Sequence, residues 1–395
     1  MNARATTSSL LSNPILKGSY LNYLLITSIF HYYFQLSHST RKRVSKRMKS
    51  GNLEKLEHLD LSKVCIFAGY CAKMTISDIE YLKILRSQGY VVIYINNGKI
   101  RDDDKKFLNI HDCIYFERIN LGRDVGAYQD GYLFLKENNL LEKVKFLMFT
   151  NDSLQFIPGS YSDRLFKSIE NFEKSTYEAY YITKSFTPLP HFQSFLMILT
   201  PHIFMSSNYS KFMKNYIPLN NRRHSIMNFE IKICTKVLNK YTNVFIENTV
   251  AKLVEQEELS DRQASLKKAS YKVTRPDLEQ DKLQSHPFYD VNEQEDSFLG
   301  ELENGNLSHN CAFLLTRFLN FPYFKKDLCL QSSYSIAVTV SQYRKNLELS
   351  INPKNEENNQ LIKSLITEFE NMLYHRGTKD SYRLRIREAI QKGIF

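Results

Sequence analysis

The sequence predicts an α/β fold with a mainly parallel β-sheet flanked by helices. From Lys63 onward, short apolar runs alternate with amphipathic segments, which is the pattern of buried strands that alternate with helices. The composition of the 395 residues, 43% hydrophobic and 24% charged, is that of a globular protein. Strands that alternate with helices pair in parallel through right-handed crossovers.

The individual elements follow from runs of apolar residues and from capping residues. We expect four buried strands, over 63–68, 90–95, 112–117 and 144–150. Between them we expect a helix over 77–88, with Ser77 as its cap and Gly89 closing it, and a helix over 124–137. Further strands are predicted over 177–186 and 191–200, and further helices over 221–238, 310–319 and 360–373.

Changes in composition divide the chain into four regions. Residues 1–58 form a basic and aromatic N-terminal arm that is predicted to be helical, and residues 59–250 form the α/β domain. Residues 251–297 are polar and indicate a linker or a surface excursion. Helical periodicity returns in residues 298–395. We therefore expect helical extensions at both ends of the α/β domain.

The N-terminal arm carries most of the net charge. Residues 1–50 hold eight Lys and Arg and no acid, so the remaining 345 residues account for only +3 of the total +11. The apolar and aromatic run over 19–34 precedes the basic run over 41–49. It is short for a transmembrane span. Residues 19–49 therefore fit an interfacial helix on an anionic membrane surface, or a packing helix followed by a solvated basic helix.

Two functional classes are disfavoured by the placement of charges and cysteines. Because the basic residues cluster at one terminus rather than across a sheet face, we expect no nucleic-acid partner. The six cysteines form no CxxC pair and mostly lie in apolar runs. They are typical of buried, reduced thiols in a cytosolic protein.

Polar residues follow the third and fourth predicted strands, where ligands of parallel sheets bind. The segment 120–131 reads Asn-Leu-Gly-Arg-Asp-Val-Gly-Ala-Tyr-Gln-Asp-Gly, and its glycines and helix start would allow close approach of a ligand. The segment 150–153 reads Thr-Asn-Asp-Ser and offers a carboxylate and an amide to a divalent cation. Each segment also fits a turn or a packing device without a ligand.

Taken together, these segments resemble the rhamnan synthesis protein F family. Its members carry an N-x-G-x-D-x-G-A-x-x-x-G segment followed by a hydrophobic strand that ends in N-D-S, as in 120–131 and 146–153 here. The run His191-Phe-Gln193-Ser194 is similar to the family's H-x-Q-S strand, and Phe229-Glu230 to its Y-E helix. Near the C-terminus, 306–309 and 321–326 are similar to its N-P-T-H and P-F-I-K elements.

The resemblance implies a GT-A-like glycosyltransferase with a Rossmann-type sheet, active on bacterial surface polysaccharide such as capsule or the O-antigen of lipopolysaccharide. Asp152 then stands where such enzymes bind Mg²⁺ or Mn²⁺. The residues expected to contact the nucleotide-sugar donor are Asn120, Gly122, Arg123, Asp124, Gly126 and Asn151. Two positions depart from the family: Gly69 replaces a His before Tyr70, and Arg123 replaces an aromatic residue.

The chemistry of glycosyl transfer assigns further roles. The departing nucleoside diphosphate is stabilised by a divalent cation and nearby basic groups. If the configuration inverts, a carboxylate must accept the proton of the acceptor hydroxyl, and Asp124 and Glu230 are the candidates. His191 is a further catalytic candidate, and Gln193 and Ser194 are candidates for acceptor binding. Each of these residues also has a purely structural interpretation. Arg222 and Arg223 could likewise contact a phosphate or simply be solvated.

Two other functions remain open on the sequence alone. A sugar-phosphate transferase of capsule synthesis would use the same metal-bound diphosphate but transfer a phosphosugar. A non-catalytic subunit would use the basic arm to seat a polysaccharide assembly at the membrane. In each case we expect a cytoplasmic protein, peripheral on the inner membrane, whose partner is a glycan or lipid-linked glycan.

Overall fold

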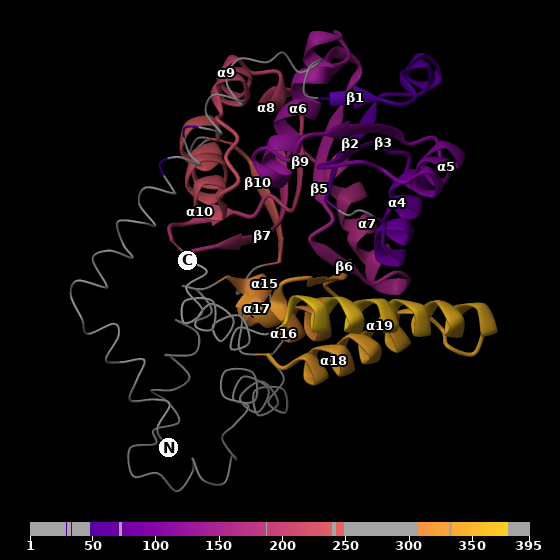
Figure 1. Cartoon of the computed structure of the whole chain (residues 1–395). Coiled ribbons are helices and arrows are strands. Elements are labelled where there is room, and N and C mark those ends of the chain that lie inside the picture. Colours follow the sequence, from indigo (N-terminus) through magenta and orange to yellow (C-terminus); the bar gives the residue numbers. More distant parts are fainter. Residues whose placement is uncertain are drawn as a thin grey trace, which may run out of the picture.

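A nine-stranded β-sheet forms the centre of the computed structural model (Figure 1). The structure describes Ile29, Tyr33 and residues 48–70, 73–186, 188–238, 242–248, 306–331 and 334–377. The strands of this sheet are β1 (Met48–Ser50), β2 (Lys63–Gly69), β3 (Val91–Asn96), β4 (Ile114–Arg118), β5 (Phe146–Asn151), β7 (Ala179–Ser185), β8 (His191–Phe192), β9 (Leu196–Leu199) and β10 (Val244–Asn248). Their order is β1-β4-β3-β2-β5-β9-β7-β10, and β8 pairs with β7.

The direction of the strands places a ligand-binding edge between β2 and β5. Strands β4, β3, β2 and β5 are mutually parallel, whereas β9 runs antiparallel to both β5 and β7. The chain passes from β2 outward through β3 to β4 and then returns to the other side of β2 as β5. Such a reversal of strand order is the topological switch point, where the carboxyl ends of the strands open a crevice.

Helices cover both faces of the sheet because the strand residues alternate between two hydrophobic cores. Cys65 and Phe67 point to the core beneath α4 (Ile76–Ser87), α5 (Asp102–Ile110) and α7 (Ser160–Glu173). Val64 and Ile66 point to the core beneath α6 (Arg123–Glu137), α8 (Pro201–Phe204) and α9 (Ser207–Asn215). Strands that are buried on both faces read as continuous apolar runs, which explains why the sequence predicts them well.

A helix with π-type turns completes the second face. It runs through α10 (Arg222–Ser225), η3 (Ile226–Glu230) and η4 (Ile233–Val237). Its residues Phe229, Ile233 and Val237 pack into the same core as α6 and α9. Short 3-10 helices, η1 (Leu53–His58) and η2 (Leu141–Lys143), lie in the connections.

The C-terminal region packs against the carboxyl end of the sheet. Strand β11 (Tyr323–Lys325) pairs antiparallel with β6 (Leu154–Phe156), which follows β5 directly, and Asn306 forms a β-bridge with Ser185 at the end of β7. The helices of this region are α15 (Leu307–Asn310), α16 (Ala312–Leu319), α17 (Leu328–Gln331), α18 (Ile336–Ser350) and α19 (Glu356–Arg376). Figure 1 shows α18 and α19 lying side by side below the sheet. Their buried side chains belong to a third hydrophobic core.

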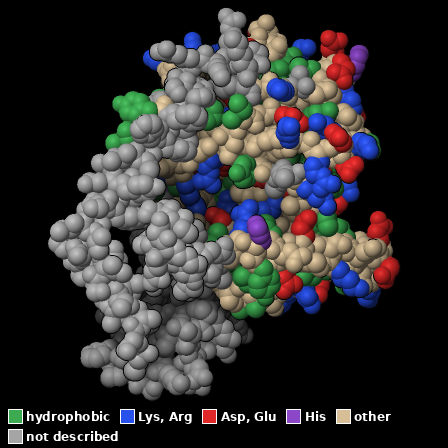
Figure 2. Space-filling model, in the orientation of Figure 1, with side chains coloured by type: hydrophobic (Ala, Val, Ile, Leu, Met, Phe, Trp, Pro, Cys, Tyr) green, Lys and Arg blue, Asp and Glu red, His purple; other side chains and the backbone are tan. Residues whose placement is uncertain are grey.

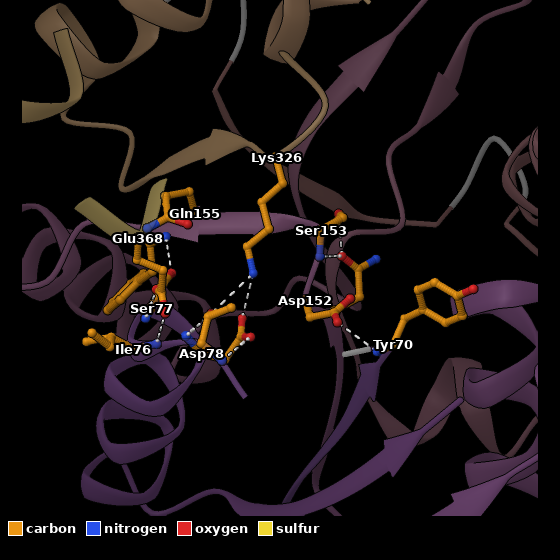
Figure 3. Close-up of polar contacts among 12 residues, drawn as sticks. Tyr70, Ile76, Ser77, Asp78, Asp152, Ser153, Gln155, Lys326 and Glu368 are labelled. Atoms are coloured by element: carbon orange, nitrogen blue, oxygen red, sulfur yellow. Dashed lines mark hydrogen bonds and ion pairs between the residues drawn. The ribbon is translucent and has the colours of Figure 1, made fainter. Parts of the chain in front are cut away.

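Polar contacts at the start of α4 join this region to the sheet domain (Figure 3). The carboxylate of Glu368 on α19 accepts hydrogen bonds from the backbone N–H groups of Ile76 and Ser77, at 2.8 and 3.2 Å. The Nζ atom of Lys326 lies 3.0 Å from Oδ1 of Asp78, and both side chains are buried. Two of the N–H groups that a helix leaves unpaired at its start are thus satisfied by a distant helix.

The structure confirms a mixed α/β fold with a mostly parallel central sheet flanked by helices. The predicted strands and helices are found within a few residues of their expected bounds, with three corrections. The cap of α4 is Thr75, which forms a capping box with Asp78, and not Ser77. The run 191–200 is not one strand, because residues 193–195 separate β8 from β9. Residues 48–58 belong to the sheet domain rather than to the arm, since β1 pairs with β4.

Most of residues 1–47, together with 249–305 and 378–395, lies outside the described residues. The predictions for the membrane-facing run 19–49 and the linker over 251–297 fall almost wholly on these parts. Among the described helices, none has the length and hydropathy that a membrane span requires.

Candidate active site

The Gly-rich segment after β4 is fixed by packing. Gly122 has φ +77° and begins α6, and a Cβ there would meet Pro218 at 2.3 Å. At Gly126, a Cβ would lie 1.9 Å from the carbonyl oxygen of Leu121. The glycines therefore allow protein segments to approach one another, and the expectation that Gly126 contacts a donor is not supported by its position.

The start of α6 is also occupied by a side chain of the protein. The Oδ1 atom of Asn220 accepts hydrogen bonds from the N–H groups of Gly122 (2.7 Å) and Arg123 (3.3 Å), and its Nδ2 donates to the carbonyl of Asn120 at 2.7 Å. These N–H groups were expected to face a ligand. The structure corrects this expectation, because Asn220 already satisfies them.

A buried ion pair also stabilises the loop between β4 and α6. Arg118 at the end of β4 contacts Asp130 on α6 at 2.9 Å, and neither side chain has solvent exposure. Arg118 also donates to the carbonyl of Leu121 at 2.9 Å and to the side chain of Asn97. Sequence reasoning missed Arg118 and Asn97, because the pairing partners of a buried charge are not visible in a linear pattern.

Asn151, at the end of β5, connects the two predicted segments. Its Nδ2 donates to Asp124 Oδ2 at 2.9 Å and to the hydroxyl of Tyr128 at 3.1 Å. Its Oδ1 accepts from the backbone N–H of Ser153 at 3.0 Å. Asn151 thus positions Asp124 and the turn that carries Asp152, and the residue is 2% exposed.

Asp152 lies at the switch point of the sheet. Its backbone N–H donates to Ala68 at the end of β2, and its Oδ2 accepts a hydrogen bond of 2.7 Å from the N–H of Tyr70 (Figure 3). The side chain is half-buried. Asp152 therefore presents a carboxylate where β2 and β5 end, at the edge where parallel sheets bind ligands.

A small polar pocket of about 120 Å³ lies beside this turn. The sequence-predicted site residues that line it are Arg123, Asp124, Asn151, His191, Gln193, Ser194 and Glu230. Asn306, His309 and Lys325 of the two C-terminal motifs line it as well. Segments up to 200 residues apart in the chain thus meet in one pocket, whereas Asn120, Gly122, Gly126 and Asp152 do not line it. Figure 2 shows Lys, Arg and acidic side chains gathered in a hollow between the sheet domain and α18–α19.

Glu230 is held by donors on one wall of the pocket. Its Oε1 accepts from the N–H and the hydroxyl of Ser194 at 3.0 and 2.7 Å, and its Oε2 lies 3.5 Å from His191 Nε2. Although burial raises the pKa of Glu230, His191 and Ser194 outweigh burial and lower it. Burial conversely lowers the pKa of His191, but Glu230 raises it overall. Each group therefore favours the charged form of the other, and Glu230 is a weak candidate for a general base.

Gln193 and Ser194, the candidates for acceptor binding on this wall, also form hydrogen bonds within the protein. The hydroxyl of Ser194 is committed to Glu230, and Oε1 of Gln193 accepts from Ser308 at 3.0 Å. Ser194 thus orients Glu230 instead of presenting a free hydroxyl to an acceptor.

The opposite wall holds a second group of charges. Asp327, just after β11, accepts from His309 Nε2 at 3.0 Å and from Arg222 at 3.0 Å. Burial alone would raise the pKa of Asp327, but His309 and Arg222 together hold it far below its usual value. Sequence reasoning missed Asp327, since it lies in a turn with no distinguishing pattern. Of the predicted arginine pair, Arg222 lines the pocket and Arg223 does not.

Asp124 differs from the other two acids of the pocket. Its Oδ2 accepts from Asn151, and burial raises its pKa, an effect that Arg123 only partly opposes. A carboxylate with a raised pKa that lines a pocket is the better proton acceptor. The structure therefore favours Asp124 over Glu230 for this role.

A larger cleft of about 920 Å³ lies at the carboxyl ends of β2 and β3. It is lined by Tyr70, by residues 96–103 and by Lys106. Two hydrogen bonds link residues that line this cleft to the loop and the turn that flank the polar pocket. The Nδ2 atom of Asn97 donates to the carbonyl of Arg123, and the N–H of Tyr70 donates to Asp152. The turn at Asp152 thus separates a large cleft from a small polar pocket.

A divalent cation at this turn would be held by a single protein carboxylate. Among the described residues, no group of three or more His, Cys, Asp or Glu side chains is arranged as a metal cage. Mg²⁺ is commonly bound by one or two carboxylates together with waters and substrate phosphates. Asp152 fits that mode, because its carboxylate is half-buried at the switch point.

Comparisons with known proteins give little beyond this geometry. No protein-family model matches the chain. Over 153 residues it is 29% identical to the uncharacterized protein y4gN of Sinorhizobium fredii (strain NBRC 101917 / NGR234), a match that covers 38% of this chain and 39% of that protein. A solved structure of 4-diphosphocytidyl-2C-methyl-D-erythritol synthase from Anaerococcus prevotii DSM 20548 aligns at a TM-score of 0.29 and 11% identity, over 48% of this chain and 88% of that one. The function is therefore argued from the site.

Proposed function

We propose that the protein is a GT-A-like glycosyltransferase of the rhamnan synthesis type. It would transfer a sugar from a nucleotide-sugar donor to a bacterial surface polysaccharide. The observation that carries this proposal is the convergence of six sequence-distant motifs on one polar pocket beside the switch point. Packing alone does not require charged side chains from so many segments to line the same pocket, because burying a charge is costly.

The two adjoining cavities suit the two ends of a nucleotide sugar. The cleft at β2 and β3 is large enough for a nucleoside, and the ring of Tyr70 at its edge is 64% exposed and available for stacking on a base. The diphosphate would then cross the turn at Asp152. The sugar would enter the polar pocket, where Asp124, Gln193 and Arg123 face it.

Each side chain of the site has its own role in the proposed transfer. Asp124 accepts the proton of the acceptor hydroxyl, while Asn151 orients its carboxylate. Glu230 holds His191 and Ser194 in place, and Asp327 holds His309 and Arg222. Asp152 would bind Mg²⁺ or Mn²⁺ together with the donor phosphates, and the cation would stabilise the negative charge of the departing diphosphate.

The test is incubation with a panel of nucleotide sugars and Mg²⁺ or Mn²⁺, scored by release of nucleoside diphosphate. Asp152→Asn should keep the hydrogen bond from Tyr70, since an amide oxygen accepts as well, but should release at least about 100-fold less diphosphate. Asp163→Asn, an exposed carboxylate on α7, is the matched control.

Two outcomes would contradict the proposal. Equal release by Asp152→Asn and the parent would remove Asp152 from the reaction. A product whose mass includes a phosphate on the transferred group would indicate a sugar-phosphate transferase instead.

A further inference from the structure

Lys325 is a buried cation on the wall of the polar pocket. It is the last residue of β11, and its side chain points into the pocket while that of Lys326 points away to Asp78. Opposite orientation of neighbouring residues is the rule in a β-strand. Lys325 is only 8% exposed. Its position is therefore fixed by the β6–β11 pairing.

The contact that the structure shows for the Lys325 ammonium group is with an aromatic ring. The Nζ atom lies 3.4 Å from the ring centroid of Phe195, which is a cation–π contact. Among the residues that the structure describes, no hydrogen bond or ion pair to this ammonium group is found. Cation–π contact recovers only part of the cost of removing an ammonium group from water.

The acids around Lys325 are each engaged by other donors. Asp327 is bound by His309 and Arg222, and Glu230 is bound by Ser194 and faces His191. Asp124 accepts from Asn151. The ammonium group is thus a buried strong donor of this pocket that the described residues leave unused, next to acids that attract it only through space.

We propose that Lys325 is a binding site for an oxyanion, a phosphate or carboxylate group of the ligand that enters the polar pocket. This inference rests on the proposed function for the identity of that ligand, but the site itself needs no turnover. A buried charge without a partner is costly in the free protein and gains most when an anion arrives.

Two sources of the oxyanion share this chemistry. Lys325 pairs in register with Leu154, two residues beyond Asp152, so an anion on Lys325 lies close to the proposed path of the donor diphosphate. Alternatively, the anion is the carboxylate of an acidic sugar. Inorganic pyrophosphate and glucuronate are therefore the two probes, each titrated calorimetrically into the full-length protein.

The substitution Lys325→Met keeps the length of the side chain and removes the charge. We expect it to weaken binding of the recognised probe by about 10- to 100-fold, and to raise the Tm of the free protein by about 3 °C because a costly buried charge is gone. Lys325→Arg should retain binding. Lys167→Met, an exposed lysine on α7, is the matched control and should change neither quantity.

The pH dependence provides a second readout. Burial lowers the pKa of Lys325 to about 8, against the opposing attraction of Asp327, Glu230 and Asp124. Arg222 and His309 also face this group. Binding of the probe should therefore weaken as the pH rises through about 8, and Lys325→Arg should shift this loss to higher pH.

The outcomes separate cleanly. Binding of pyrophosphate assigns the site to the donor diphosphate, and binding of glucuronate assigns it to an acidic sugar. Affinity that is unchanged in Lys325→Met, or absence of binding for both probes, would overturn the inference. The Asp152→Asn assay measures turnover, whereas this titration measures binding alone. A failure of the proposed function is therefore distinguished from a failure of the Lys325 site.

Discussion

The ammonium group of Lys326 and the carboxylate of Asp78 form an ion pair of 3.0 Å in which both side chains are about 1–2% exposed. The pair joins the residue that follows β11 to the first turn of α4, and the two residues are 248 positions apart. The Nζ atom of Lys326 also donates to Oγ1 of the cap residue Thr75, at 3.4 Å. The C-terminal region is therefore attached to the sheet domain through a desolvated charge pair as well as through apolar packing.

Lys326→Met should destabilise the protein strongly, in contrast to Lys325→Met. Removing one partner leaves Asp78 buried without its counter-charge, which costs about 3–5 kcal/mol. Urea unfolding of the single variants and of Lys326→Met/Asp78→Asn measures the effect. The double variant should recover part of the loss, and equal stability of Lys326→Met and the parent would show that the pair contributes nothing.

The pair of His191 and Glu230 predicts a pH window for stability. The pKa of Glu230 is lowered in the folded state, so its contribution is present above its ordinary value of 4.5 and is lost as the pH falls through the folded value. The pKa of His191 is raised, so its contribution is complete below 6.5 and is lost as the pH rises through the folded value.

Unfolding midpoints measured across pH should therefore show a plateau between about 4.5 and 6.5 that is higher in the parent than in His191→Gln. The difference between the two proteins should shrink on both sides of this plateau. A difference that stays constant from pH 4 to pH 9 would contradict the ion pair.

The glycines of the segment 120–131 predict a ranking of stability losses. At Gly126 a new Cβ meets a backbone oxygen at 1.9 Å, which cannot move without displacing the loop. At Gly131 it meets only side-chain ends of Ile66 and Ile95, at 2.8–3.0 Å. Gly126→Ala should lose about 3 kcal/mol or more and Gly131→Ala about 1–2 kcal/mol. Thermal unfolding measures both, and the reverse order would be inconsistent with this packing.

The raised pKa of Asp124 predicts how the rate of transfer depends on pH on the acidic side, or acidic limb, of the pH–rate profile. As a general base it acts only when ionised, so transfer should rise with pH through a value above the ordinary 3.8. Asp124→Asn should lower kcat by about 100- to 10,000-fold and remove this limb. Glu230→Gln is the informative comparison, because it should retain the limb. A limb that disappears in Glu230→Gln but persists in Asp124→Asn would assign the base to Glu230.

The basic arm predicts binding to anionic membranes. Because β1 begins at Met48, deletion of residues 1–47 removes no strand of the described sheet. The shortened protein should keep its unfolding midpoint and lose flotation with phosphatidylserine vesicles in low salt, whereas neutral vesicles serve as the control. Undiminished flotation of the shortened protein would place the membrane contact elsewhere.

Sequence patterns predicted the parts of the fold that local chemistry determines. Doubly buried strands such as 63–69 and 91–96 are continuous apolar runs, and they were found where expected. Helix α5 was missed because it begins Asp-Asp-Asp-Lys-Lys and shows little apolar periodicity. Helix α4 is capped two residues before Ser77, since Thr75 and Asp78 satisfy each other's hydrogen-bonding groups.

The site was predictable as a set of segments but not as a set of contacts. Asp124, Asn151, His191 and Glu230 were singled out, and they line one pocket. The partners that determine their roles, such as Ser194 for Glu230 and Asn220 for the start of α6, depend on long-range packing. Asp327 was invisible for the same reason, because its environment is created by residues from two other elements.

The pairing of β6 with β11 has a consequence for synthesis of the protein. A nascent chain that has reached residue 248 carries every strand of the central sheet, yet it lacks Lys325, His309 and Asp327. A ribosome must translate roughly 80 further codons before the pocket can close. A chain truncated after residue 248 would therefore carry the central sheet without the C-terminal wall of the polar pocket.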